Sequence, residues 1–129
     1  EVYSKILKIK ISYLHMNQIT ISKSIFREYF GNSPYIKVLD FLIQGQEFDY
    51  SMTEIARQSG VGWSTFTIIW KQLIKKEVVK QTRTIGNARL FKLNKENIFV
   101  KKLIKFDSEL TKLETDKMLI NVSKRKIVA

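Results

Sequence analysis

Residues 51–76, SMTEIARQSGVGWSTFTIIWKQLIKK, predict two short helices joined by a tight corner that contains glycine. Ser51 and Glu54 match an S-x-x-E capping box, in which a hydroxyl and a carboxylate satisfy free N–H groups at a helix start. Gly60 ends the first helix, and the second covers about residues 63–76. Two helices around such a corner are typical of DNA-reading domains when the outer face of the second is polar, and they fit an ordinary helical hairpin equally well.

The second helix has two distinct faces when it is drawn at 100° per residue. We expect its apolar face to be buried, and this face holds Phe66, Ile69, Trp70, Leu73 and Ile74. The remaining positions include our candidates for contact with DNA: Trp63, Ser64, Thr65, Thr67, Ile68, Lys71 and Lys75. Hydroxyls can meet base edges or phosphates, Ile68 can meet thymine methyl groups, and Lys71 can reach guanine or a phosphate. The alternative is a plain solvated face, which an exposed Ile68 does not favour.

A β-hairpin is predicted directly behind this motif. Residues with a preference for strands fill 78–84 and 88–93, and the Gly-Asn pair between them can supply the positive φ of a tight turn. A hairpin in this place is the wing of a winged helix. Arg83, Asn87 and Arg89 lie near its tip, where arginine can enter a narrow minor groove. Solvated arginines are the alternative.

Positive charge is concentrated in the same part of the chain. The 129 residues carry a formal net charge of +11, and residues 71–92 hold seven Lys or Arg against one acid, Glu77. Such a field attracts polyanions, which include nucleic acid and anionic membrane surfaces. The positive charge lies on the second helix and the wing, which favours nucleic acid over a membrane surface. Basic side chains that neutralise DNA phosphates add affinity whatever the base sequence.

Two further helices are predicted upstream, over residues 24–30 and 34–44. Ser33 suits the N-cap of the second, and Pro34 suits its first position because proline lacks only an N–H that would have no partner there. We expect the aromatic and aliphatic side chains of this region to enter the core: Ile25, Phe26, Tyr29, Phe30, Ile36, Val38, Leu39, Leu42, Ile43, Phe48 and Tyr50.

Residues 1–24 are an N-terminal extension to this set of helices. Apolar and polar side chains alternate over positions 9–13 and 18–21, which favours a β-hairpin. Alternatively, Met16 is the natural start of the protein and the residues before it are an added segment. The extension is therefore either a hairpin or a linker.

A final helix is predicted over residues 95–122, capped by Asn94, and a basic tail follows over residues 123–129. Apolar side chains recur at alternating steps of four and three in Phe99, Leu103, Phe106, Leu110 and Leu113. This a/d stripe spans two heptads, and we interpret it as a homodimer contact. The acids along the helix are expected to form surface ion pairs with neighbouring lysines: Asp107, Glu109 and Glu114.

Composition excludes several kinds of site. Cysteine is absent, which removes disulfides, thiol catalysis and thiolate zinc sites, and His15 is the only histidine. No Ser/His/Asp set, phosphate-binding loop or paired-carboxylate site is recognisable. The sequence also lacks a signal peptide and an apolar run of the ~20 residues that a membrane helix needs. We therefore expect a cytoplasmic protein that is neither an enzyme nor dependent on a metal or cofactor.

Three stretches resemble a family of small winged helix–turn–helix transcriptional regulators, especially archaeal ones: IFREYFGNSPYIKVLDFLI at 25–43, FDYSMTEIARQSGV at 48–61 and VKQTRTIGNARLFKLNKEN at 79–97. The resemblance covers roughly residues 25–110. It implies site-specific binding of duplex DNA, with the helix after the turn in the major groove and the wing beside it. Gly62 departs from the Ser or Thr cap that such proteins often have, and Trp63 departs from their polar or basic residue.

We therefore predict a mainly α fold with a small β-wing, that is, a winged helix–turn–helix with an additional C-terminal helix. Residues 25–94 would form the DNA-binding domain and residues 95–122 the dimerisation helix. The predicted function is that of a transcriptional regulator that binds double-stranded DNA as a homodimer on a palindromic operator. The alternative is a winged helix that makes protein contacts in a transcription or replication assembly. The operator, the sign of regulation and any small-molecule effector are not specified by the sequence.

Overall fold

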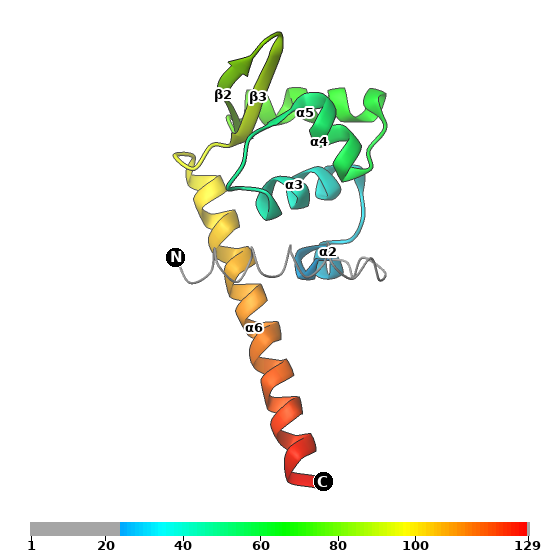
Figure 1. Ribbon diagram of the computed structural model, residues 1–129, viewed down its shortest axis with the longest axis vertical. Coiled ribbons are helices and arrows are strands. Elements are labelled where there is room, and N and C mark those ends of the chain that lie inside the picture. Colours follow the sequence, from blue (N-terminus) through cyan, green and yellow to red (C-terminus); the bar gives the residue numbers. More distant parts are fainter. Residues whose placement is uncertain (1–23, 129) are drawn as a thin grey trace.

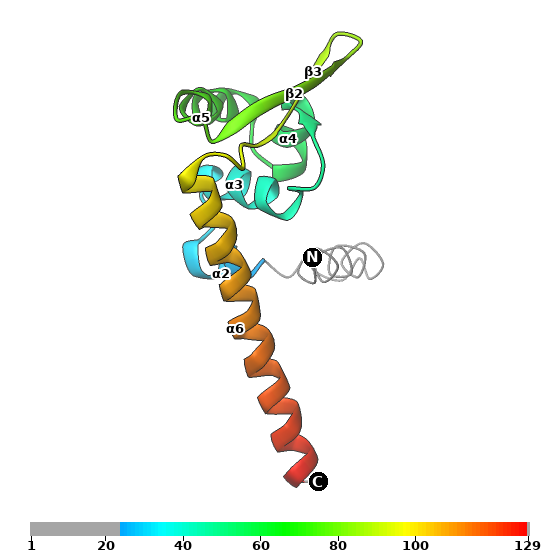
Figure 2. The same cartoon turned by 90° about the vertical axis from the view of Figure 1, so that its left-hand side faces the viewer.

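The computed structural model describes residues 24–128 (Figure 1). Its elements, in chain order, are α2 (Ile25–Phe30), α3 (Pro34–Gln44), β1 (Tyr50–Ser51), α4 (Met52–Ser59), α5 (Trp63–Lys75), β2 (Val79–Ile85), β3 (Ala88–Leu93) and α6 (Ile98–Val128). Figures 1 and 2 show a head made of α3, α4, α5 and the sheet, from which α6 extends as one long rod to the C-terminus. The β-hairpin expected over positions 9–21 and the start at Met16 lie outside the described residues.

Short polar side chains and glycines begin and end the helices of the head, as the sequence predicts. The hydroxyl of Ser51 accepts a hydrogen bond from the N–H of Glu54 at 3.2 Å, and the hydroxyl of Ser33 accepts one from Ile36 at 3.3 Å. Gly60 ends α4 with a φ of 72°, a left-handed conformation that glycine adopts without steric cost. The starts of α3 and α4 and the end of α4 are therefore set by their local chemistry.

Ser24 is the N-cap of α2, in line with the helix predicted over residues 24–30. Its hydroxyl accepts a hydrogen bond from the N–H of Arg27 at 3.2 Å and so caps the helix. The same hydroxyl donates to a carboxylate oxygen of Asp40 on α3, at 2.6 Å. Because Asp40 is buried, this bond ties the short helix to the head.

The sheet has three antiparallel strands in the order β1-β3-β2. β2 and β3 form the predicted wing, and Gly86, with a φ of 59°, stands in the two-residue turn between them. β1 lies in a segment for which the sequence predicts only a loop. Its Tyr50 pairs with Phe91 and its Ser51 with Leu90. This pairing joins the base of the wing to the start of α4.

The core lies between α3, α4, α5 and β3, and the first turns of α6 close it. Its fully buried large side chains are Val38, Ile43, Ile55, Phe66, Leu73, Val78, Leu93 and Val100. The buried face of α5 consists of Phe66, Ile69, Trp70 and Leu73, as predicted. The fold is thus a winged helix–turn–helix with a small sheet and an additional C-terminal helix, which confirms the predicted fold class.

Some apolar side chains expected in the core are exposed instead. Tyr29, Phe30, Phe48 and Ile74 have 55%, 50%, 58% and 44% of their surface accessible. α2 is a helix of six residues, and Phe26 alone occupies its buried side. Phe48 lies in the loop between α3 and β1, and Ile74 lies about 90° around α5 from the centre of the buried stripe. The prediction that these four side chains are buried is therefore wrong.

α6 starts later and ends later than predicted. It begins at Ile98 because the N–H of Asn97 donates to the carbonyl of Asn94 at 3.1 Å and closes a turn ahead of the helix. Asn97, and not Asn94, then caps the helix by accepting a hydrogen bond from the N–H of Phe99 at 2.8 Å. The backbone stays helical to Val128, so most of the expected basic tail is part of the helix.

Only the first half of α6 packs against the rest of the described chain. Val100 is fully buried and Leu110 is buried, whereas every side chain from 115 to 125 is exposed. The predicted a/d stripe is divided, because three of its members are exposed: Phe99, Phe106 and Leu113. Asp107 has only 3% of its surface accessible, so it is buried and not on the surface where it was expected. It lies one turn from Leu110, on the side of the helix that faces the head.

The end of the packed half is braced by α2. The hydroxyl of Tyr29 donates to a carboxylate oxygen of Glu114 at 2.8 Å, which lowers the pKa of Glu114 and raises that of Tyr29. Phe30 contacts the edge of Phe106, with ring centroids 5.9 Å apart. Glu114 also pairs with Lys117 at 3.5 Å, as the sequence predicts for the acids of this helix. α6 therefore leaves the head just beyond these contacts.

Candidate nucleic-acid interface

One side of α5 is exposed along the helix, at the end of the molecule opposite to the C-terminus of α6 (Figures 1 and 2). Most of the DNA-contact residues predicted for this helix are exposed: Trp63, Ser64, Thr65, Ile68, Lys71 and Lys75. Ile68 is 62% accessible and lies in the middle of this side, between Ser64 and Lys71. The helix thus presents hydroxyl, apolar and basic side chains together to solvent.

Trp63 is the first residue of α5 and the outermost member of a column of aromatic rings. It stacks on Phe66, with ring centroids 5.6 Å apart, and Phe66 stacks on Trp70 at 5.3 Å. Trp70 in turn meets the edge of Phe91 on β3 at 5.2 Å. Trp63 is 53% accessible although Phe66 beneath it is fully buried. The exposed indole is therefore held against a rigid support, and the column connects α5 with the wing.

The first turns of α5 are less equipped for hydrogen bonding than their sequence suggests. Gly62 occupies the N-cap position without a side-chain hydrogen bond, in line with its departure from the usual cap. Thr67 is half-buried, and its hydroxyl donates to the carbonyl of Ser64 within the same helix at 2.9 Å. That donor is occupied by the backbone, which the sequence pattern could not reveal.

A β-bulge in β2 directs two side chains towards the segment before β1. The strand register shifts between Gln81 and Arg83, which leaves Thr82 as the extra residue. The Thr82 hydroxyl donates to Oδ2 of Asp49 at 2.6 Å. The Arg83 guanidinium donates through Nε to the same oxygen at 2.9 Å and through Nη2 to Oδ1 at 3.1 Å. Asp49 therefore holds the middle of the wing through three hydrogen bonds.

These bonds change the ionisation of both charged groups. The hydrogen bond from Arg83, followed by the one from Thr82, lowers the pKa of Asp49 to about 2. The carboxylate of Asp49 raises the pKa of Arg83. The sequence assigns Arg83 to DNA, and the structure gives it this partner while 62% of its side chain stays accessible. Asp49 itself escaped the sequence analysis, because its partner lies 34 residues away and meets it only through the bulge.

The tip of the wing carries the remaining predicted contacts. Asn87 and Arg89 are both exposed, and Arg89 pairs with Thr84 across the hairpin. Further exposed basic side chains extend from the end of α5 along the outer strand: Lys71, Lys75, Lys76, Lys80 and Arg83. The fold thus brings the basic residues of the second helix and of the wing to the same end of the molecule (Figure 2).

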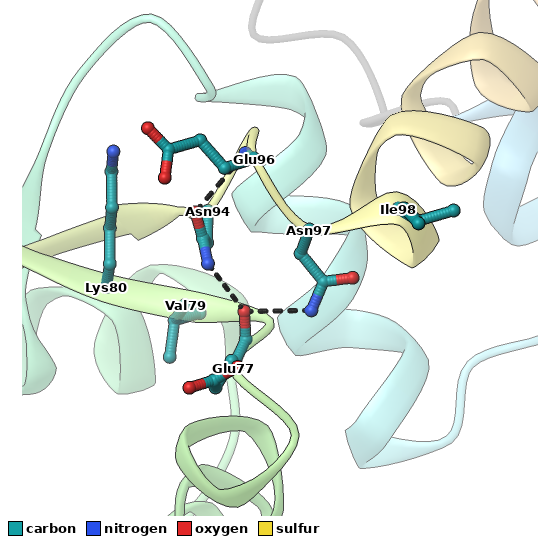
Figure 3. A pocket seen from close by; sticks show the side chains of 7 residues that line it. All are labelled: Glu77, Val79, Lys80, Asn94, Glu96, Asn97 and Ile98. Atoms are coloured by element: carbon teal, nitrogen blue, oxygen red, sulfur yellow. Dashed lines mark hydrogen bonds between the residues drawn. The ribbon is translucent and has the colours of Figure 1, made fainter.

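A hollow lies where the end of α5, the base of β2 and the start of α6 meet (Figure 3). Its lining residues are Glu77, Val79, Lys80, Asn94, Glu96, Asn97 and Ile98. The carbonyl of Glu77 accepts hydrogen bonds from the side-chain amides of Asn94 and Asn97, at 3.1 and 3.0 Å. Glu77 has a φ of 55°, a conformation that is costly for a residue with a side chain. The two amides hold this strained turn and connect α5 to α6.

Comparison with known proteins yields structural matches alone. No protein-family model matches the sequence. No curated protein matches it either. A structure of a ZitR mutant from Lactococcus lactis, in apo form, aligns over 99% of this chain and 89% of that chain, with 16% identity and a TM-score of 0.51. Another ZitR mutant aligns over 71% of this chain, with 20% identity and a TM-score of 0.49, and this chain spans only 66% of that protein's length.

The PcaV transcriptional regulator from Streptomyces coelicolor aligns over 98% of this chain and 92% of that chain, with 15% identity and a TM-score of 0.46. At such identities a likeness concerns the fold. The ZitR alignment with the TM-score of 0.51 extends over almost the whole chain, and so includes α6 as well as the head. The fold that this chain shares with that ZitR structure is the winged helix–turn–helix with a C-terminal helix.

The described part of the chain holds neither a candidate metal site nor a candidate membrane span. Residues 24–128 contain no group of three or more His, Asp or Glu side chains that could hold a metal ion. Within the same residues, no helix combines the length and the apolar composition needed to cross a membrane.

Proposed function

We propose that this chain is a transcriptional regulator of the small archaeal winged-helix type, which acts in the cytoplasm and binds a specific sequence of double-stranded DNA. The observation that carries the proposal is the exposed face of α5 beside a basic wing, at one end of the molecule. Residues 71–92, which include the second half of α5 and the wing, hold seven basic residues against Glu77 alone. A surface of this charge suits the phosphates on both sides of a DNA groove.

In this proposal α5 enters the major groove with its N-terminal half towards the bases. Ser64 and Thr65 approach base edges, while Lys71 reaches guanine or a phosphate and Lys75 a phosphate. Thr67 contributes less than its sequence position suggests, because its hydroxyl donates to the backbone. The proposed base contacts therefore concentrate on the exposed side of the first two turns.

The wing follows the neighbouring backbone, and its tip reaches the minor groove. Asn87 and Arg89 are the proposed contacts at the tip, since an arginine side chain suits a narrow minor groove. Arg83 has a double role in this account. It fixes the wing through Asp49, and its exposed guanidinium edge is free to approach a phosphate.

We further propose that two copies associate through α6. Large apolar side chains are exposed on the half of α6 that extends beyond the head: Leu113, Met118, Leu119, Ile120 and Val122, which are 47–68% accessible. Each would gain about 1–2 kcal/mol if its remaining accessible surface became buried. The contact is therefore placed further along the helix than the predicted Phe99–Leu113 stripe, part of which packs on the head. Two heads related by a twofold axis would bind a palindromic operator.

Selection of bound sites from random duplexes tests the proposal. We expect a preferred sequence with two related half-sites, whose binding survives an excess of unrelated competitor DNA. Binding of that duplex, measured by fluorescence anisotropy, should weaken severalfold in Lys71→Ala and in Arg89→Ala. Lys112→Ala is the matched control, because it removes an exposed lysine from α6, away from the proposed interface.

Two outcomes would contradict the proposal. One is the absence of any enriched sequence and of duplex binding, which would favour a winged helix that makes protein contacts. The other is equal affinity of the wild type, Lys71→Ala and Arg89→Ala, which would exclude the proposed face even if DNA is bound elsewhere.

A further inference from the structure

The first six residues of α5, WSTFTI at positions 63–68, contain no side chain that reads a base with two hydrogen bonds. Arginine and lysine pair in this way with guanine, and asparagine and glutamine with adenine, while aspartate and glutamate accept from cytosine. None of these residue types occurs in α5 before Lys71. A reading helix built in this way must obtain most of its specificity from something other than paired hydrogen bonds.

The exposed side chains of these two turns are largely apolar. Ile68 has 62% of its surface accessible and occupies the middle of the reading face. Trp63 is 53% accessible and is held in place by stacking on Phe66. The available hydroxyls are those of Ser64 and Thr65, because the one on Thr67 donates to the backbone. The first two turns of α5 therefore offer two exposed apolar side chains, about 140° apart around the helix, and two available hydroxyls.

The basic residues near Ile68 and Trp63 indicate which kind of molecule covers these two side chains. Lys71 and Lys75 continue the exposed side of α5. The β2–β3 hairpin, which carries the exposed Arg89, lies at the same end of the molecule as α5 (Figure 2). Exposed apolar side chains on a basic surface complement a DNA major groove, where apolar groups of the bases lie between the two phosphate backbones. The apolar group that DNA presents there is the 5-methyl of thymine.

We propose that Ile68 and Trp63 read thymine methyl groups, so that the preferred duplex carries A·T pairs beneath the first two turns of α5. The inference rests on the DNA-binding function proposed above and adds the class of base that is recognised. Contact with a methyl group requires only an apolar surface at the correct place, which both side chains provide without moving a buried neighbour.

Replacement of thymine by uracil tests the inference, because it removes the methyl group and leaves every hydrogen bond of the base pair unchanged. The probe is the duplex obtained by site selection, with uracil placed at one thymine position at a time. For the wild type we expect affinity to fall roughly three- to tenfold at one or more positions in each half-site. Ile68→Ala should lose the difference between thymine and uracil at one of these positions and keep it at the others.

Trp63→Ala should lose the same difference at a neighbouring position. Ile74→Ala is the matched control for Ile68→Ala: it removes the same side chain from the same helix at a site that is 44% accessible and lies beyond the reading turns. It should retain every thymine preference. Circular dichroism spectra would verify that the variants are folded, which we expect for changes at exposed positions.

The possible failures are distinguishable. If the selected duplex binds tightly and uracil changes nothing at any position, the methyl-reading inference is overturned while the DNA-binding function stands. If thymine preferences exist but survive both Ile68→Ala and Trp63→Ala, the assignment to these residues is wrong. If no duplex is bound, the inference and the proposed function fail together, and the two apolar side chains belong to a protein contact.

Discussion

Arg83 and Asp49 form a two-pronged ion pair, with Nε 2.9 Å from Oδ2 and Nη2 3.1 Å from Oδ1. Arg83 lies on the outer strand β2, whereas Asp49 immediately precedes β1, on the other side of β3. The pair therefore spans the sheet. The bulge at Thr82 directs the Arg83 side chain towards Asp49. It links the orientation of the wing to the loop that leads into α4.

The Asp49–Arg83 pair predicts how stability depends on pH. The pKa of Asp49 is lowered from 3.8 to about 2 in the folded chain, so its ionised form stabilises the fold. That stabilisation is complete above pH 3.8 and is lost as the pH falls towards about 2. We expect wild type to have a higher Tm than Asp49→Asn near neutral pH, with a difference that shrinks below about pH 4.

Thermal unfolding followed by circular dichroism measures this difference across the pH range. The same comparison in an Arg83→Ala background is the control, and its pH-dependent part should be smaller because only the Thr82 hydroxyl remains as a side-chain donor. A Tm difference that stays constant, or that grows on acidification, would be incompatible with a lowered pKa at Asp49.

The column of aromatic rings along α5 predicts that two phenylalanine substitutions differ strongly in their effect on stability. Phe66 is fully buried between Trp63 and Trp70, whereas Phe48 is 58% accessible. Phe66→Ala should lower the free energy of unfolding by about 3–5 kcal/mol, since it leaves a cavity in the core. Phe48→Ala removes the same atoms and should change it by less than about 0.5–1 kcal/mol. Urea denaturation of both variants measures the contrast, and equal losses would place Phe48 in the core after all.

Asn97 makes more hydrogen bonds than Asn94 at the junction between α5 and α6. Asn97 donates to the carbonyls of Lys76 and Glu77 and accepts from the N–H of Phe99. Asn97→Ala removes the helix cap together with both donations, and should cost about 1–2 kcal/mol of unfolding free energy. Gln58→Ala, at an exposed amide on α4, is the control and should be nearly neutral. Chemical denaturation measures the free energy of unfolding of both variants. An unchanged value for Asn97→Ala would show that other contacts hold the junction.

The exposed half of α6 predicts the oligomeric state. Static light scattering of the wild type should give twice the chain mass of 15.2 kDa. Leu119→Glu combined with Ile120→Glu should give the monomer mass, because two carboxylates would have to be buried in the contact. Lys101→Glu produces the same change in net charge on the packed half of the helix, and should remain a dimer. A monomeric wild type would rule out association through α6.

The helix boundaries that could be predicted are those set by neighbouring residues. The hydroxyl of Ser51, the ring of Pro34 and the left-handed φ of Gly60 each act within one turn of the chain, so the sequence contains the full information. The exposed and buried faces of α5 follow in the same way from the helical period. Ile68 and Lys71 were placed correctly on the exposed side for this reason.

The features that could not be predicted depend on partners far along the chain. β1 has two residues, too few for an alternating pattern, and it exists because Tyr50 meets Phe91. The Asp49–Arg83 pair requires a bulge of one residue, and the burial of Asp107 requires α6 to lie against the head. On α5, the internal bond of Thr67 was also missed, because a hydroxyl in a helix can point to either the backbone or solvent.

The salt dependence of duplex binding tests the central claim most directly. If the exposed side of α5 and the wing neutralise phosphates, a plot of log affinity against log salt concentration should fall with a slope of about −4 or steeper. Lys71→Ala and Arg89→Ala should each make the slope shallower by about 1, while Lys112→Ala should leave it unchanged. A slope near zero, or a steep slope that neither Lys71→Ala nor Arg89→Ala alters, would contradict the assignment of this surface to DNA.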